Sequence, residues 1–131
     1  GLENGKAHQF TFDQALTYAL ARSLTALGFT AADAFSVAVF GFGRDGDKRR
    51  QPFKLYPAEL GETFFIAYPK RGTVAPHGEC YPARELPGLD GLFIPYGVGP
   101  GIEGVEAFAA INLTGIHDRV AAELQRDRET A

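Results

Sequence analysis

A dense run of helix start and stop signals near the N-terminus constrains this chain more than any other feature. Thr11 stands before an apolar-periodic stretch and Gln14 follows three residues later, which is the capping-box pattern of a helix start. Gly28 occupies a position where a helix ends in a left-handed residue. Thr30 and Asp33 then predict the start of another helix. Signals spaced this closely predict two helices joined by a very short turn.

The apolar residues of both predicted helices recur at intervals of three and four. In the first helix they are Phe12, Leu16, Leu20, Leu24 and Leu27. In the second helix, expected from about Ala31, they are Ala34, Phe35, Ala38, Val39 and Phe42. Residues 35–42 also fit a strand that ends at Gly41 or Gly43, but the cap at Thr30 and the spacing favour a helix.

After residue 43 the pattern changes to short β-type runs bounded by glycine and proline. The polar stretch 44–52 is the expected internal boundary. The expected strands are Phe53–Tyr56, Thr63–Tyr68, Gly91–Tyr96 and Ala107–Leu113. Residues 70–87 contain several glycines and prolines and are expected to form a loop, with one more short strand near Val74. A last helix is expected from Thr114, with Ile116, Val120 and Leu124 facing inward.

These patterns predict an α+β fold. Residues 1–43 are expected to form an N-terminal hairpin that turns at Asn4-Gly5, followed by the helical pair. Residues 44–131 are expected to form a small, mainly antiparallel β-sheet packed by helices, including the C-terminal helix. We expect the two parts to make one compact unit.

Charge and composition exclude several classes of protein. The net charge is −3, which argues against a surface that grips nucleic acid along its whole extent. The basic run Arg44, Lys48, Arg49 and Arg50 is interleaved with Asp45 and Asp47, which predicts a solvated turn. Cys80 is the single cysteine, and the sequence has neither a signal peptide nor a long apolar run, so we expect a cytoplasmic protein with no membrane association. The chain begins with Gly1 and has no methionine, as expected of a piece of a longer protein.

Two short motifs suggest chemistry, but neither has the context that it needs. Gly99–Gly104 matches G-x-G-x-x-G, yet these glycines lead into a predicted strand instead of a helix, which favours a β–β loop over a cofactor site. His77 and Cys80 have the spacing of a metal or nucleophile pair, but a zinc site needs four ligands and no second pair is present. We therefore expect no catalytic residue, no cofactor and no metal ion.

The β part of the chain is rich in aromatic side chains. They are Phe53, Tyr56, Phe64, Phe65, Tyr68, Tyr81, Phe93 and Tyr96. Most of them are expected in the core. The candidates for lining a small-molecule pocket are Tyr81, Tyr96 and His77, because a gap between sheet and helix is the usual place for a small ligand.

The segment GLENGKAHQFTFDQALTYALARSLTALGFTAADA resembles the second half of the winged-helix DNA-binding domain of MerR-type regulators. The matching residues are Gly5, His8, Phe10, Thr11, Asp13, Leu20, Leu24, Gly28, Phe29 and Thr30. In that family a helix-turn-helix precedes the wing, and here the resemblance covers only about residues 2–40. It implies that DNA is bound through an upstream helix-turn-helix missing from this chain, and that Lys6 and His8 contact the DNA backbone. It also implies a homodimer.

Two hypotheses follow. The first is a regulatory, non-enzymatic protein that resembles the C-terminal part of a bacterial or prophage MerR-like transcriptional regulator, with a module for dimerisation or small-molecule sensing. The alternative is a free-standing small-molecule-binding domain or small enzyme, with a pocket near His77, Cys80 and the Gly97–Gly104 loop.

Overall fold

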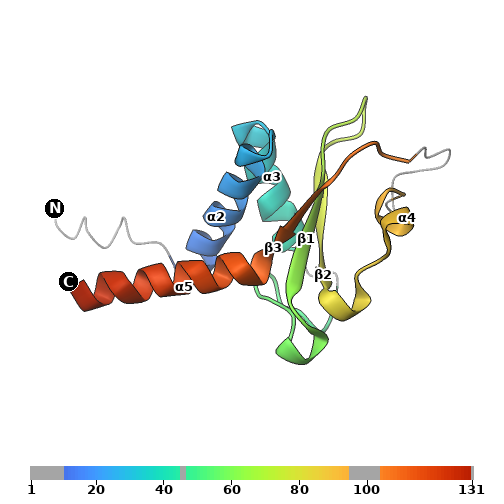
Figure 1. The fold of residues 1–131 in the computed structure, drawn as a ribbon. Helices are drawn as coiled ribbons and strands as arrows, with labels where there is room; N and C mark the ends of the chain where they lie inside the picture. Colours follow the sequence, from blue (N-terminus) through green and yellow to red (C-terminus); the bar gives the residue numbers. More distant parts are fainter. Residues whose placement is uncertain (1–10, 45–46, 95–103, 131) are drawn as a thin grey trace.

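A three-stranded antiparallel sheet with helices on both faces forms the centre of the molecule (Figure 1). The computed structural model describes residues 11–44, 47–94 and 104–130. Its elements are α2 (Phe12–Ala26), α3 (Ala31–Phe42), η1 (Ala58–Leu60), β1 (Thr63–Tyr68), β2 (His77–Pro82), η2 (Ala83–Glu85), α4 (Leu89–Leu92), β3 (Ala109–Asn112) and α5 (Leu113–Thr130). The predicted α+β class is confirmed. Within the described ranges, no helix has the length and apolarity that crossing a membrane requires.

The turn between α2 and α3 has the geometry that the N-terminal signals predict. The Thr11 and Gln14 side chains each accept the other residue's backbone N–H, at 3.1 and 2.9 Å, which completes the capping box. Gly28 has φ of 109°, and the Phe29 N–H donates to the Leu24 carbonyl at 3.1 Å, as in a Schellman motif. Thr30 caps α3 directly afterwards, so the helical alternative for residues 35–42 is confirmed over the strand.

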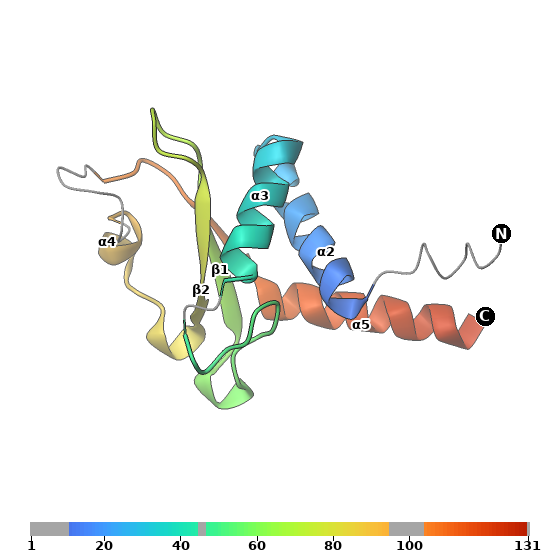
Figure 2. The same cartoon turned by 180° about the vertical axis from the view of Figure 1, so that it is seen from behind.

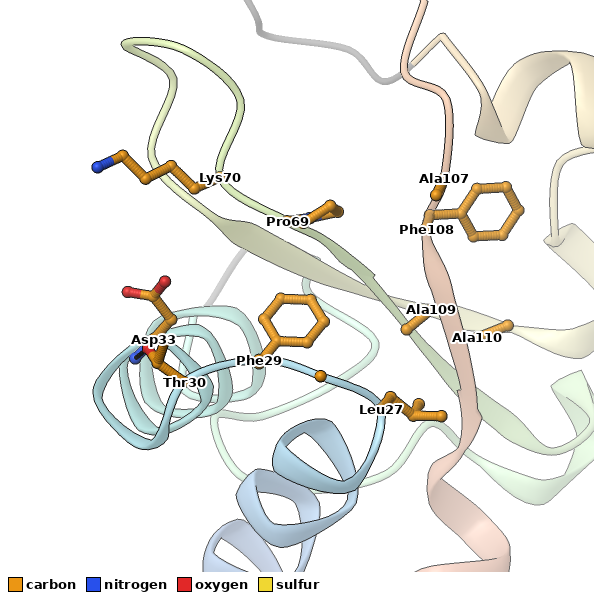
Figure 3. Close-up of a pocket in the computed structure, with 11 residues that line it drawn as sticks. Leu27, Phe29, Thr30, Asp33, Pro69, Lys70, Ala107, Phe108, Ala109 and Ala110 are labelled. Carbon is orange, nitrogen blue, oxygen red and sulfur yellow. Dashed lines mark hydrogen bonds between the residues drawn. The ribbon is translucent and has the colours of Figure 1, made fainter.

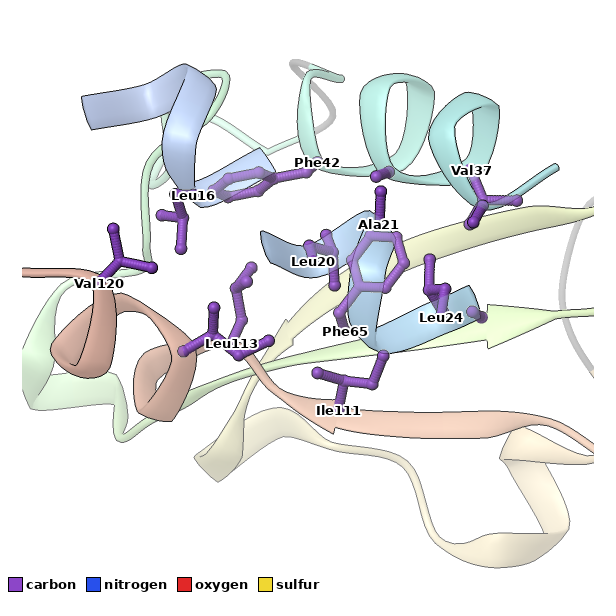
Figure 4. Packing of buried hydrophobic residues seen from close by; sticks show 14 residues of the cluster. Leu16, Leu20, Ala21, Leu24, Val37, Phe42, Phe65, Ile111, Leu113 and Val120 are labelled. Atoms are coloured by element: carbon purple, nitrogen blue, oxygen red, sulfur yellow. The ribbon is translucent and has the colours of Figure 1, made fainter. Parts of the chain in front are cut away.

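The main core lies between the sheet and the three long helices (Figure 4). Side chains alternate along β1, so that Phe65 and Ala67 face this core while Ile66 and Tyr68 face the opposite side. Figures 1 and 2 show α2 and α3 on one side of the sheet, with α5 crossing the lower end of α2. The buried residues of this core are Leu16, Leu20, Ala21, Leu24, Ala34, Val37, Ala38, Phe42, Phe65, Ala67, Ile111, Leu113, Ile116 and Val120.

Two glycines let α3 pack directly against β2. A Cβ added at Gly41 would come within 2.7 Å of the Phe65 ring, and one at Gly78 within 2.4 Å. Both distances are shorter than any normal carbon–carbon contact, so the Phe65 ring occupies the space that the two side chains would need. The glycine in β2 is therefore a packing requirement of this face.

The opposite face of the sheet carries a smaller cluster. Ile66, Tyr68 and Leu92 are its buried residues. The Tyr68 hydroxyl donates a hydrogen bond of 2.6 Å to the Leu92 carbonyl, which connects β1 to the short helix α4. Phe108 contacts the same cluster from the segment that leads into β3, with its ring centroid 5.9 Å from that of Tyr68.

Strand β3 continues into α5 without a loop. The Asn112 side chain accepts the Gly115 N–H at 3.0 Å, which caps the new helix, and donates to Glu62 at 2.7 Å. The Thr114 hydroxyl accepts the Thr63 N–H at 2.7 Å, which attaches the first turn of α5 to β1. The helix therefore begins at Leu113, one residue earlier than predicted.

Two predicted strands are wrong. Phe53–Tyr56 begins in a turn and continues without regular secondary structure. Phe53 has φ of 63°, and its N–H donates to the Phe42 carbonyl at 3.0 Å, which closes the end of α3. The Gly91–Tyr96 prediction fails because α4 ends at Leu92, and its last residues lie outside the described ranges. The predicted strand 107–113 is present as the shorter β3.

The predicted loop 70–87 is also wrong in part, because it contains β2. Glycine and proline concealed this strand, although Gly78 is needed for contact with Phe65 and Pro82 stands at the strand end. Near Val74 the structure has only an isolated bridge to Arg71. The Asn4-Gly5 hairpin lies outside the described residues.

Candidate ligand-binding site

An open pocket of about 550 Å³ lies where the α2–α3 turn faces one end of the sheet (Figure 3). Three segments distant in sequence form its walls: the turn itself, the residues after β1, and the segment that leads into and begins β3. The lining residues are Leu27, Gly28, Phe29, Thr30, Asp33, Pro69, Lys70, Ala107, Phe108, Ala109 and Ala110. The volume falls within the range of about 300–1,000 Å³ that is usual for small-molecule sites.

Local sequence explains why this space stays open. The Schellman turn places Phe29 between the helices and the sheet, where it packs on the main core. Pro69 follows the last residue of β1 and cannot donate to a continuing ladder. Ala107 and Ala109 have small side chains, so the β3 segment leaves the gap unfilled. Figure 3 shows the Phe108 ring pointing away from the turn, toward the second cluster.

The pocket combines apolar walls with a few polar groups. Phe29, Leu27 and Pro69 provide apolar surface, while Lys70 and Asp33 provide one charge of each sign on the same side of the opening (Figure 3). The Thr30 hydroxyl accepts the Asp33 N–H at 3.1 Å. Among the described strands β3 is at an edge of the sheet, and an edge strand keeps backbone donors and acceptors that the sheet does not use. Such a site suits a flat, apolar organic molecule with a polar or anionic end.

The predicted ligand residues His77 and Tyr81 lie elsewhere, on the second face of the sheet. His77 stacks on Tyr68 with ring centroids 4.8 Å apart, and its Nε2 is buried without a hydrogen-bond partner. The Tyr81 hydroxyl donates to Glu79 at 2.7 Å. Burial, and after it this hydrogen bond, raises the pKa of Tyr81. Neither residue lines the open pocket.

The structure does not bring His77 and Cys80 together. They are three residues apart on one strand, and successive side chains of a strand alternate between faces, so they point to opposite sides of the sheet. Desolvation raises the pKa of the Cys80 thiol to about 11, which keeps it protonated at neutral pH. Within residues 11–44, 47–94 and 104–130, no three side chains of the metal-ligating types gather into a site for an ion.

The remaining predicted site residues are Lys6, His8, Tyr96 and the Gly97–Gly104 loop. Lys6, His8 and Tyr96 lie outside the described residues, as does the Gly97–Gly104 loop except for Gly104 itself. Sequence reasoning identified the capping residues Thr30 and Asp33 but gave them only a structural role. The pocket depends on the distance between the α2–α3 turn and the edge of the sheet. No local sequence motif predicts that distance.

Comparison with known proteins does not assign this chain to a family. The chain matches no protein-family model, no curated protein and no solved structure. The candidate site is therefore defined by the shape and chemistry of the pocket between the α2–α3 turn and the sheet.

Proposed function

We propose that this chain is a regulatory, non-enzymatic module that binds a small molecule, and that it forms the C-terminal part of a regulator resembling the MerR type. The observation that supports the proposal is the open pocket of about 550 Å³ between the α2–α3 turn and the sheet. Its apolar walls favour a small organic molecule, and Lys70 at the opening can pair with an anionic group on that molecule.

The position of the pocket fits a sensing role. The α2–α3 turn and the sheet provide separate walls, so a bound molecule would contact both parts at once. A ligand shifts a conformational equilibrium only as far as it binds one arrangement more tightly than another. In the resembled family the two helices follow the DNA-contacting wing. A ligand in this pocket would contact the far end of α2, the helix that would connect the pocket to the wing.

DNA binding and dimerisation are further parts of the proposal. DNA would be bound through an upstream helix-turn-helix, and Lys6 and His8 would contact the DNA backbone. With a net charge of −3, the chain alone should bind duplex DNA weakly, because contacts to phosphates dominate such affinity. The proposed homodimer would form through a surface other than Ile116 and Val120, which are buried within the chain.

The ligand proposal can be tested with the fluorescent probe 1-anilinonaphthalene-8-sulfonate, which has an apolar body and one anionic group. We expect saturable binding at one site per chain. Ala107→Trp places a large ring in the pocket from an exposed position and should weaken binding at least about tenfold by excluding the probe. Lys70→Gln should weaken it about threefold to tenfold through loss of the charge partner.

The matched control is Ala122→Trp, which adds the same ring at another exposed alanine, on α5. It should bind the probe as the unchanged chain does. The native chain has no tryptophan, so each variant also carries a single indole whose emission reports whether the fold is retained. Equal binding by both tryptophan variants would contradict the pocket as the ligand site.

A further inference from the structure

A second, smaller cavity of about 200 Å³ lies between the C-terminal end of α3, the segment after it, and β2. Charged and polar side chains dominate its walls: Arg44, Asp47, Arg50, Tyr56 and Glu79. None of them lines the pocket beside the α2–α3 turn. The two cavities therefore call for separate explanations.

Arg50 is the central residue of this cavity. The expectation of a solvated turn is wrong for it, because only 5% of its surface is exposed. Its Nη1 donates to the Phe42 carbonyl and its Nη2 to the Arg44 carbonyl, both at 2.9 Å. The guanidinium also lies 5.8 Å from the Phe42 ring and 5.7 Å from the Tyr56 ring. These contacts fix its position at the C-terminal end of α3, where a cation is favoured.

The buried guanidinium still lacks one partner. Its Nε is buried and has no hydrogen-bond acceptor. Among the described residues, Arg50 also forms no ion pair with a carboxylate. A buried charge without a counter-charge is costly, and a buried donor without an acceptor adds to that cost. An anion in the cavity would supply the missing counter-charge.

Two more donors on the same walls have only weak acceptors. The Tyr56 hydroxyl is 3.3 Å from an Asp47 oxygen and 3.5 Å from the Cys80 carbonyl, beyond the usual range of about 2.5–3.0 Å. The Arg44 guanidinium is 3.8 Å from Glu79, longer than a charge-assisted hydrogen bond. Burial raises the pKa of Tyr56, so its hydroxyl keeps the proton to donate.

The two carboxylates on the walls already have partners. Asp47 accepts from Arg49 at 2.8 Å, and Glu79 accepts from the Tyr81 hydroxyl at 2.7 Å. Neither carboxylate forms an ion pair with Arg50. Their negative charges do disfavour a ligand with two or more charges, such as a phosphate, because like charges repel at short range.

We propose that this cavity binds a small monocarboxylate, held by the Tyr56 hydroxyl and the Arg44 guanidinium beside the buried charge of Arg50. A guanidinium matches the planar carboxylate group, and about 200 Å³ accommodates a molecule of only a few heavy atoms. The proposal does not depend on the function assigned to the larger pocket.

The test is a titration of the ¹⁵N-labelled chain with sodium acetate, exchanged against sodium chloride at constant ionic strength. The readout is the side-chain Nε–H resonance of Arg50 in a ¹H–¹⁵N spectrum, because this group lies beside the cavity and senses a charge placed in it. We expect a saturable shift with acetate. Acetamide has the same shape without the charge and should give no saturable shift. An equal shift with acetamide, or no response to acetate, would overturn the proposal.

Variants separate the site from general ion effects. Tyr56→Phe removes only the hydroxyl and should weaken acetate binding about threefold to tenfold, and Arg44→Gln should do the same from an exposed position. Arg84→Gln is the matched control, because Arg84 is an exposed arginine on η2 outside the cavity, and it should bind as the unchanged chain does. Arg50 itself is kept, since its loss would also release the end of α3. Unchanged affinity in both cavity variants would contradict the assignment.

Discussion

The two faces of the sheet are built in different ways, although β1 contributes alternate residues to both. On one face Phe65 and Ala67 meet a continuous apolar layer from three helices of at least three turns each. On the other face Ile66 and Tyr68 meet a helix of four residues, and a hydrogen bond from Tyr68 holds it in place. The comparison indicates that the first face supplies most of the stability, while the second is positioned by a few specific contacts.

The largest effect should come from truncating the ring at the centre of the helix-covered face. Phe65→Ala leaves a cavity between α3, β1 and β2 and should cost about 3–5 kcal/mol of unfolding free energy, measured by urea denaturation. Leu92→Ala is the corresponding change on the second face and should cost less, about 2 kcal/mol. Equal losses would break the comparison between the faces.

A smaller effect should follow from adding a methyl group under the same ring. Gly78→Ala places a Cβ within 2.4 Å of Phe65, and overpacking of this kind should cost about 1–3 kcal/mol. Combining it with Phe65→Leu should recover part of the loss, because the smaller side chain frees that space. Gly88→Ala is the control, since no atom lies within 4 Å of its added Cβ and it should be nearly neutral.

On the second face, Tyr68→Phe removes a single hydroxyl. We expect a loss of about 1 kcal/mol, because the Leu92 carbonyl loses its donor at 2.6 Å. The change should act locally, so amide hydrogen exchange should accelerate in α4 and hardly change in α2. Faster exchange throughout the main core would show that the two faces are not separable in this way.

The smallest effect concerns the Arg49 ion pairs at the rim of the sheet. Arg49 bonds both Asp47 and Glu85, and these hydrogen bonds lower the pKa of each carboxyl below its usual 3.8 and 4.5. The resulting stabilisation is fully present above those usual values and is lost as the pH falls through the lowered ones.

Melting curves of Arg49→Gln across this pH range would test the assignment. We expect a slightly lower melting temperature than that of the unchanged chain at neutral pH, because exposed ion pairs contribute little. The two melting temperatures should converge in acid. A difference that stays constant down to the lowest pH would show that Arg49 acts through packing instead of charge.

The helices that cover the first face of the sheet were largely predictable from sequence, because the residues that start and end them act on neighbours close in the sequence. Thr11, Gln14, Gly28 and Thr30 each act within a few residues, and the structure confirms all four. Strand β2 was missed because Gly78 is explained only by the Phe65 ring, which belongs to a different strand. Local sequence could not reveal that contact.

The candidate sites were less predictable for a related reason. The Arg44–Arg50 run looked like a solvated turn, and the burial of Arg50 depends on carbonyls that the end of α3 places around it. The larger pocket likewise joins Phe29 to Lys70 and Ala109, residues that no spacing rule connects. A sequence pattern can assign a residue to a helix or strand, but the presence of a cavity depends on how far apart those elements lie in the fold.

The loop-free junction at Asn112 has a mechanical consequence. The 18 residues of α5 extend for about 27 Å, and the far half of this helix projects beyond α2 (Figure 1). Because β3 runs straight into the helix, Ala109 and Ala110 at the pocket are only a few residues from the pivot of this rod. A tilt of about 10° at the junction would displace the free end by about 5 Å. A small rotation of β3 would therefore be magnified along α5, and because Ile116 and Val120 are packed in the main core, α2 would have to move with the helix.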